Sequence, residues 1–100
     1  MYNEIINGEK FKKNIADIKS NFKKGIDNCE FKICVFVKYG DSFFSPIELA
    51  ELNAYLFEVK CIFEPKGYKV YEKKCNQCKY IDLIAQKIWI EIPTPINLTI

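Results

Sequence analysis

The chain contains no histidine and no arginine, and all fifteen of its basic residues are lysines. Without histidine there is no Ser-His or Cys-His nucleophile pair and no histidine ligand for zinc. Without arginine there is no planar guanidinium fork to hold phosphate, carboxylate or guanine through two hydrogen bonds. These absences exclude many of the commonest catalytic sites.

Glycine and serine are also scarce. The four glycines stand far apart, at positions 8, 25, 40 and 67, so the chain has no glycine-rich phosphate loop. None of the three serines lies in a G-x-S-x-G context. Glu48, Glu51 and Glu58 share one side of an expected helix, but nothing predicts the burial that would separate their pKa values. We therefore predict no catalytic residues and no enzymatic activity.

No apolar run approaches the roughly 20 residues that a membrane span needs. The first ten residues, MYNEIINGEK, lack the basic and then apolar segments of a secretory signal. A content of 49% hydrophobic and 28% charged residues is typical of a globular domain. We expect a single domain over residues 1–100 in the cytoplasm, with 1–8 and 93–100 peripheral or extended.

Five cysteines in irregular positions are a poor fit to a secreted disulfide framework. Cys75 and Cys78 form a C-x-x-C motif among lysines, a spacing that zinc sites and redox pairs share. A zinc site needs four ligands, and neither histidine nor a second C-x-x-C is present. We favour a turn bracketed by the two cysteines and expect no cofactor; a zinc or redox role for Cys75 and Cys78 is kept as an alternative.

Two helices are predicted. Over residues 9–26 the apolar positions recur at helical spacing on one face: Phe11, Ile15, Ile18, Phe22 and Ile26. The second helix should begin after Ser45, since Ser45 and Glu48 form a capping box, and end near Glu64. Phe44 and Leu49 could form its hydrophobic staple. Its main apolar stripe is Leu49, Leu52, Leu56, Val59 and Phe63, and a second strip is Ile47, Ala50, Ala54, Phe57 and Cys61.

Three strands are predicted. Residues 29–39 alternate, with one face made of Phe31, Ile33, Val35, Val37 and Tyr39. Residues 67–74 form a short strand, and 88–92 alternate again. Between them, 76–86 fits a hairpin arm kinked near Ala85 and Gln86, which we prefer, or a short helix. The order α-β-α-β-β predicts an α+β two-layer sandwich, with two helices packed on one face of a small, mainly antiparallel sheet.

The lysines are unevenly distributed. Lys12, Lys19 and Lys23 form a stripe beside the apolar face of the first helix, whereas the second helix is acidic. On the outer face of the sheet we expect aromatic and basic residues to interleave: Lys32, Phe36, Lys38, Lys69, Tyr71 and Lys73. Platforms that stack single-stranded nucleic acid have this composition, while a basic helix face suits an acidic partner.

These features predict a small, non-catalytic binding protein of inhibitor type that occludes or bridges a macromolecule. We favour a protein partner with an acidic surface and predict contacts through Lys12, Lys19, Lys23, Phe36 and Tyr71. Binding of nucleic acid is the alternative, no membrane partner is expected, and a homodimer through the second strip of the acidic helix is open. Residue usage biased to Lys, Ile and Asn suggests a phage or mobile element of a low-GC bacterium.

Overall fold

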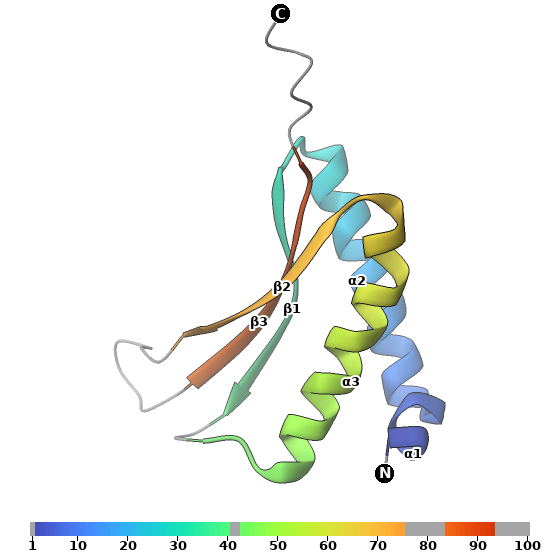
Figure 1. The fold of residues 1–100 in the computed structure, drawn as a ribbon, viewed down its shortest axis with the longest axis vertical. Coiled ribbons are helices and arrows are strands. Elements are labelled where there is room, and N and C mark those ends of the chain that lie inside the picture. The colour runs from blue at the N-terminus through green and yellow to red at the C-terminus, as the bar shows by residue number, and fades with distance from the viewer. Residues whose placement is uncertain (1, 41–42, 76–83, 94–100) are drawn as a thin grey trace, which may run out of the picture.

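A computed structural model describes residues 2–40, 43–75 and 84–93. The elements follow one another as α1 (Tyr2–Asn7), α2 (Glu9–Asp27), β1 (Lys32–Gly40), α3 (Pro46–Phe63), the 3-10 turn η1 (Glu64–Lys66), β2 (Lys69–Cys75) and β3 (Ile84–Glu91). Helices α2 and α3 lie side by side on one face of the sheet (Figure 1). The predicted α+β class is confirmed, with α1 as an additional helix where an extended or peripheral segment was expected.

The sheet has the order β1-β3-β2, and both pairs are antiparallel. Strands β2 and β3 form the preferred hairpin, and their pairing is regular through Ala85 and Gln86, where we expected a kink. Residues 76–83 lie outside the described residues, so the choice between strand and helix there stays open.

The irregularity lies instead in β1. Its register against β3 shifts between Cys34 and Phe36, which leaves Val35 as an extra, bulged residue. Ile33 and Val35 are both buried, and the ring of Phe36 also turns to the helices, 4.6 Å from that of Tyr55. One inserted residue exchanges the two faces of a strand. The single-face prediction for 29–39 is therefore wrong from Val37 onward, and Phe31, expected on the buried face, is 61% exposed.

Helix α2 follows its predicted pattern except at Ile26, which is 39% exposed. Phe11, Ile15 and Ile18 are buried, and Phe22 packs at the margin with its ring 4.7 Å from that of Phe63. The helix ends at Asp27, as Gly25 and the Asp27-Asn28 pair predict. Beyond the helix Cys29 adopts a φ of 61°, and the backbone N–H of Glu30 donates to the Gly25 carbonyl at 2.9 Å.

Helix α3 begins with the predicted capping box. The Ser45 hydroxyl accepts from the Glu48 N–H at 3.2 Å, and the Glu48 carboxylate accepts from the Ser45 N–H at 3.1 Å. The second bond is the main reason that the pKa of Glu48 lies below its usual value. The predicted staple is wrong, because Phe44 packs with Leu52 and Ile84 while Leu49 is 48% exposed.

Replacing Ser45 by alanine should lower the free energy of unfolding by about 1 kcal/mol, because it removes the side-chain acceptor of the helix cap. Urea denaturation measures the change. Ser20, exposed on α2, supplies the control, and S20A should stay within about 0.5 kcal/mol of the wild type. Equal effects of S45A and S20A would contradict the role of the cap.

The core lies between the two helices and the sheet, with Ile18, Val35, Val59, Ile88 and Ile90 as its least exposed large side chains. From α3 the predicted residues Leu52, Val59 and Phe63 are buried, and so is Tyr55, which neither predicted strip contains. The Tyr55 hydroxyl accepts a hydrogen bond from the Asn14 amide at 2.8 Å. Cys61, expected on an apolar strip, is exposed.

Candidate functional site

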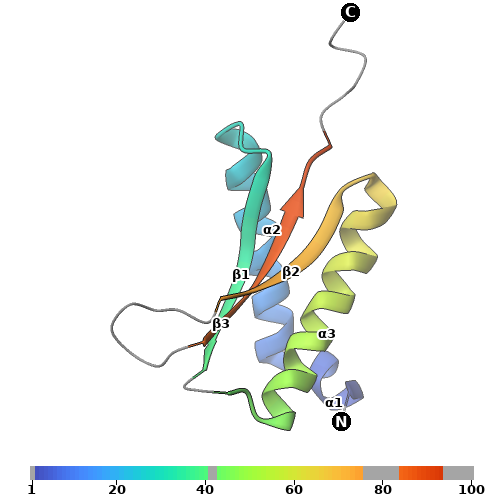
Figure 2. The same cartoon turned by 60° about the vertical axis from the view of Figure 1, so that its left-hand side comes forward.

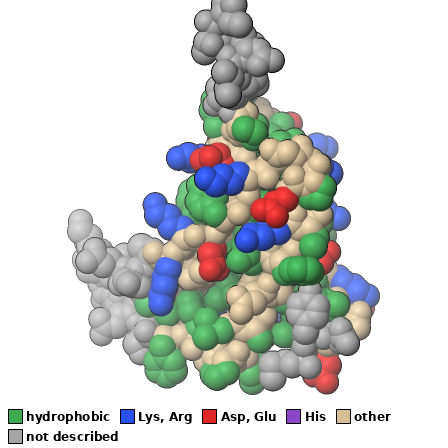
Figure 3. Space-filling model, in the orientation of Figure 1, with side chains coloured by type: hydrophobic (Ala, Val, Ile, Leu, Met, Phe, Trp, Pro, Cys, Tyr) green, Lys and Arg blue, Asp and Glu red, His purple; other side chains and the backbone are tan. Residues whose placement is uncertain are grey.

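The face of the sheet that points away from α2 and α3 is the first candidate, and we call it the outer face. None of the described helices covers it (Figure 2). The strand registers assign to it Lys32, Cys34, Val37 and Tyr39 of β1, Ala85, Lys87, Trp89 and Glu91 of β3, and Lys69, Tyr71 and Lys73 of β2. In Figure 3 lysine side chains are spaced along the side where the strands run.

Aromatic rings lie at the centre of the outer face. Trp89, on the middle strand, is in register with Cys34 on one side and Tyr71 on the other. Both rings are half-buried, and the Lys69 ammonium lies 5.8 Å from the centroid of Tyr71. The buried indole N–H of Trp89 has no hydrogen-bond partner among the described residues. Ring surface and cations therefore occur together, as a stacking surface requires.

Positive charge dominates the outer face. Lys73 and Lys87 stand directly opposite each other in the β2–β3 register. Like charges in that arrangement destabilise a sheet, so the pair lowers stability unless an anion lies nearby. Glu91 stands between Lys69 and Lys32 in register and forms an ion pair with Lys32 at 3.6 Å. Among the described residues of this face, four lysines oppose one glutamate.

The cysteines give no indication of covalent chemistry in the described part of the chain. Burial raises the pKa of Cys34 above its usual value, although Lys87 acts in the opposite direction, so its thiol is a poor nucleophile at neutral pH. Cys29 and Cys61 are exposed and free. No three His, Cys, Asp or Glu side chains gather among the described residues as metal ligands would. Cys78 lies outside these residues, so the role of C-x-x-C stays a prediction.

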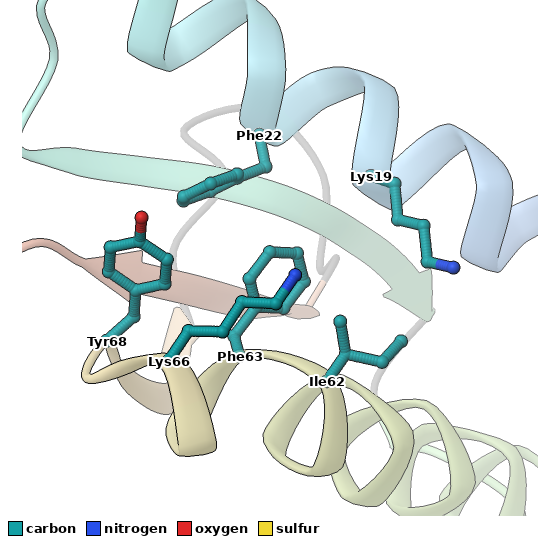
Figure 4. A pocket seen from close by; sticks show the side chains of 6 residues that line it. All are labelled: Lys19, Phe22, Ile62, Phe63, Lys66 and Tyr68. Carbon is teal, nitrogen blue, oxygen red and sulfur yellow. The ribbon is translucent and has the colours of Figure 1, made fainter.

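A second candidate lies on the opposite side of the molecule, along α2 and α3 with α1 at one end, and we call it the helical groove. One hollow of about 300 Å³ is lined by Ile6, Phe11, Lys12, Ile15 and Glu58. Another of about 330 Å³ is lined by Lys19, Phe22, Ile62, Phe63, Lys66 and Tyr68. Figure 4 shows the rings of Phe22, Phe63 and Tyr68 around this second hollow, with the Lys19 and Lys66 side chains alongside.

The five predicted contact residues are not on one surface. Lys12 and Lys19 line the helical groove, Lys23 is exposed on α2, and Tyr71 lies on the outer face. The placement of Phe36 on the outer face is wrong, because the bulge at Val35 turns its ring to Tyr55; its role as a partner contact stays a prediction.

Lys38 was also placed on the wrong face, since it forms an ion pair with Glu51 of α3 at 3.7 Å. Trp89 and Lys87 were missing from the predicted site. Their alternation with Ile88 and Ile90 was the signal that could have identified them.

A scan against protein-family models and searches of curated proteins and of solved structures found no match to this chain. In the described part of the chain, no helix combines the length and the apolar character needed to cross a membrane.

Proposed function

We propose that the protein is a non-catalytic binding protein whose outer face holds single-stranded nucleic acid. The observation that carries this proposal is the opposed pair Lys73 and Lys87 next to the rings of Trp89 and Tyr71. The protein acts by occupying or bridging a macromolecule. An inhibitor-type role in the cytoplasm belongs to the same proposal, and residue usage biased to Lys, Ile and Asn supports an origin in a phage or mobile element.

A phosphate backbone fits the charge of the outer face. An anion between Lys73 and Lys87 would offset the repulsion that their register imposes. Bases can stack on Tyr71 and Trp89 whatever their identity, because every base has a π-face. Lysine contributes point charges and no bidentate fork, so the binding should depend little on base sequence.

The addition of a partner strand to the sheet is less well supported, because both edges carry obstacles. On β1 the bulge at Val35 interrupts the edge, and the Asn21 amide already donates to the Val35 carbonyl at 3.2 Å. On β2 three lysines, Lys69, Lys73 and Lys74, protect the other edge. The face of the sheet is therefore a better binding surface than its edges.

Wild-type protein should bind a labelled single-stranded oligonucleotide in fluorescence anisotropy, with a log–log salt slope of about −2 to −3 if three or four phosphates are contacted. The double variant K73A/K87A should bind at least about tenfold more weakly, and its slope should flatten by about 1.4. The control is K74A: Lys74 is the exposed neighbour of Lys73 and points to the opposite face, in register with Gln86. K74A should bind nearly as the wild type does.

The stacking part of the proposal has its own variants. Y71L keeps apolar volume but removes the ring, and it should weaken binding about tenfold without changing the salt slope. Y71F should bind as the wild type does. The proposal fails if neither single-stranded DNA nor RNA is retained at low salt, or if K74A weakens binding as much as K73A/K87A. Binding of an acidic protein without any oligonucleotide would replace nucleic acid as the partner.

A further inference from the structure

The helical groove has an apolar floor built from contacts between α2 and α3. The rings of Phe11 and Tyr55 stack at 4.8 Å, and those of Phe22 and Phe63 meet at 4.7 Å. These two contacts join the helices near the two hollows. The side chains of Phe11 and Phe22 contribute to one hollow each. The two ring contacts therefore form the apolar base of the groove, and the hollows lie beside them.

The rim of the groove is basic. Lys12 lines the first hollow, and Lys19 and Lys66 line the second. Glu58 is the acidic residue among those that line the first hollow. The Lys66 ammonium lies 5.9 Å from the centroid of the Phe63 ring, above the apolar floor. A ligand that complements this surface has apolar groups for the hollows and carboxylates for the rim.

The lysines of α2 that line the two hollows lie at helical spacing. Lys12 and Lys19 are seven residues apart on α2, which corresponds to about 10.5 Å along the helix axis. Residues i and i+7 on one face of any other α-helix have the same separation. Each hollow, at about 300 to 330 Å³, has room for one large apolar side chain. A groove recognises an amphipathic helix through apolar anchor residues at this spacing.

Independently of the nucleic-acid proposal, we propose that the helical groove binds an acidic amphipathic helix of a partner protein, which places two apolar side chains seven residues apart in the two hollows. The carboxylates of that helix face Lys12, Lys19 and Lys66. The outer face and the helical groove lie on opposite sides of the sheet, so both can be occupied at once.

A second copy of this chain is a weaker fit to the groove. The exposed large apolar residues on the described helices are Ile26, Ile47, Leu49 and Phe57, and no two of them are seven positions apart. Helix α3 has the required acidic character, but seven residues beyond Ile47 stands Ala54, which is fully buried. The charge and the spacing together favour a different protein.

A designed peptide tests the proposal. It has about 18 residues, or five helical turns, with two leucines seven positions apart, glutamates beside them and alanine elsewhere. Calorimetry should show micromolar binding to the wild-type protein. Alanine in place of either leucine should weaken binding at least about tenfold, as for an anchor residue. A peptide with its leucines five positions apart should not bind, because they then lie on different faces of the helix.

Matched lysines on α2 test the groove from the protein side. K12E and K19E should each weaken peptide binding about tenfold or more, whereas K13E should not, since Lys13 is exposed but lines neither hollow. No binding of the peptide, equal binding of the five-spaced peptide, or unchanged binding by K19E would overturn the proposal.

Dimerisation of the free protein that K12E and K19E abolish would also overturn the proposal, because it would assign the groove to a second copy. The variant K73A/K87A should bind the peptide normally. Failure of the outer-face proposal is therefore distinguishable from failure of this one.

Discussion

Replacing Ile90 by alanine should lower the free energy of unfolding by about 3 to 5 kcal/mol. Ile90 lies on the central strand β3, in register with Ile33 on one side and Val70 on the other, and has 0% of its surface exposed. Truncation removes buried methyl and methylene groups and leaves a cavity that paired strands on both sides cannot close. The effect should exceed that of any surface variant proposed above.

Urea denaturation followed by the fluorescence of Trp89, the one tryptophan of the chain, measures this loss. Ile26, on α2 but 39% exposed, provides the matched control for the same chemical change. I26A should lower the free energy of unfolding by less than about 1 kcal/mol, because less apolar surface is buried at this position. If I90A and I26A lower the free energy of unfolding by the same amount, the placement of Ile90 in the core is wrong.

Replacing Gly25 by alanine should destabilise the protein by about 1 to 3 kcal/mol, although alanine in a helix interior normally adds about 1 kcal/mol over glycine. A Cβ at Gly25 would lie 2.6 Å from two carbon atoms of the Ile33 side chain. Ile33 is itself buried against α2, so it has little space to move. The close approach of α2 to β1 therefore requires glycine here.

A double-mutant cycle separates this clash from other effects. I33V removes one of the carbons that the new methyl group meets and should by itself cost about 0.5 to 1.5 kcal/mol. The double variant G25A/I33V should be more stable than the sum of the single effects predicts, by about 0.5 kcal/mol or more. Simple additivity would mean that Ile33 is not what excludes the side chain.

The two proposed surfaces use different residues on opposite faces of the sheet. Lys73 and Lys87 are on the outer face, while Lys12 and Lys19 line the helical groove. A protein with both activities would bridge nucleic acid and an acidic helix. K73A/K87A leaves the helical groove unchanged, and K19E leaves the outer face unchanged. The two binding activities can therefore be measured separately.

The boundaries of α2 and α3 could be predicted because their signals are local. Ser45 and Glu48 are three residues apart, and the side chain of each accepts a hydrogen bond from the backbone N–H of the other. The start of α3 therefore needs no distant contact. The apolar spacing over α2 likewise depends on neighbouring turns of one helix. The alternation of Ile88 and Ile90 with Trp89 was readable for the same reason.

The residues of the candidate site were only partly predictable. Lys12, Lys19 and Tyr71 are on the two proposed surfaces, but Phe36 and Lys38 are not on the face of the sheet where they were expected. Their placement depends on the bulge at Val35, and a bulge is a property of two paired strands. The partner strand, β3, is more than 40 residues further along the chain.

The amino acids alone specify two of the helices, the strands, an α+β class and lysine as the sole basic residue type, because each depends on residue type and on spacing within a short segment. Which lysines share a face with an aromatic ring, and which lie over an apolar hollow, was decided only when β1 paired with β3 and α2 packed beside α3. Pairing register and helix packing join residues that are distant in sequence, and one bulged residue is enough to exchange the side chains that each face presents.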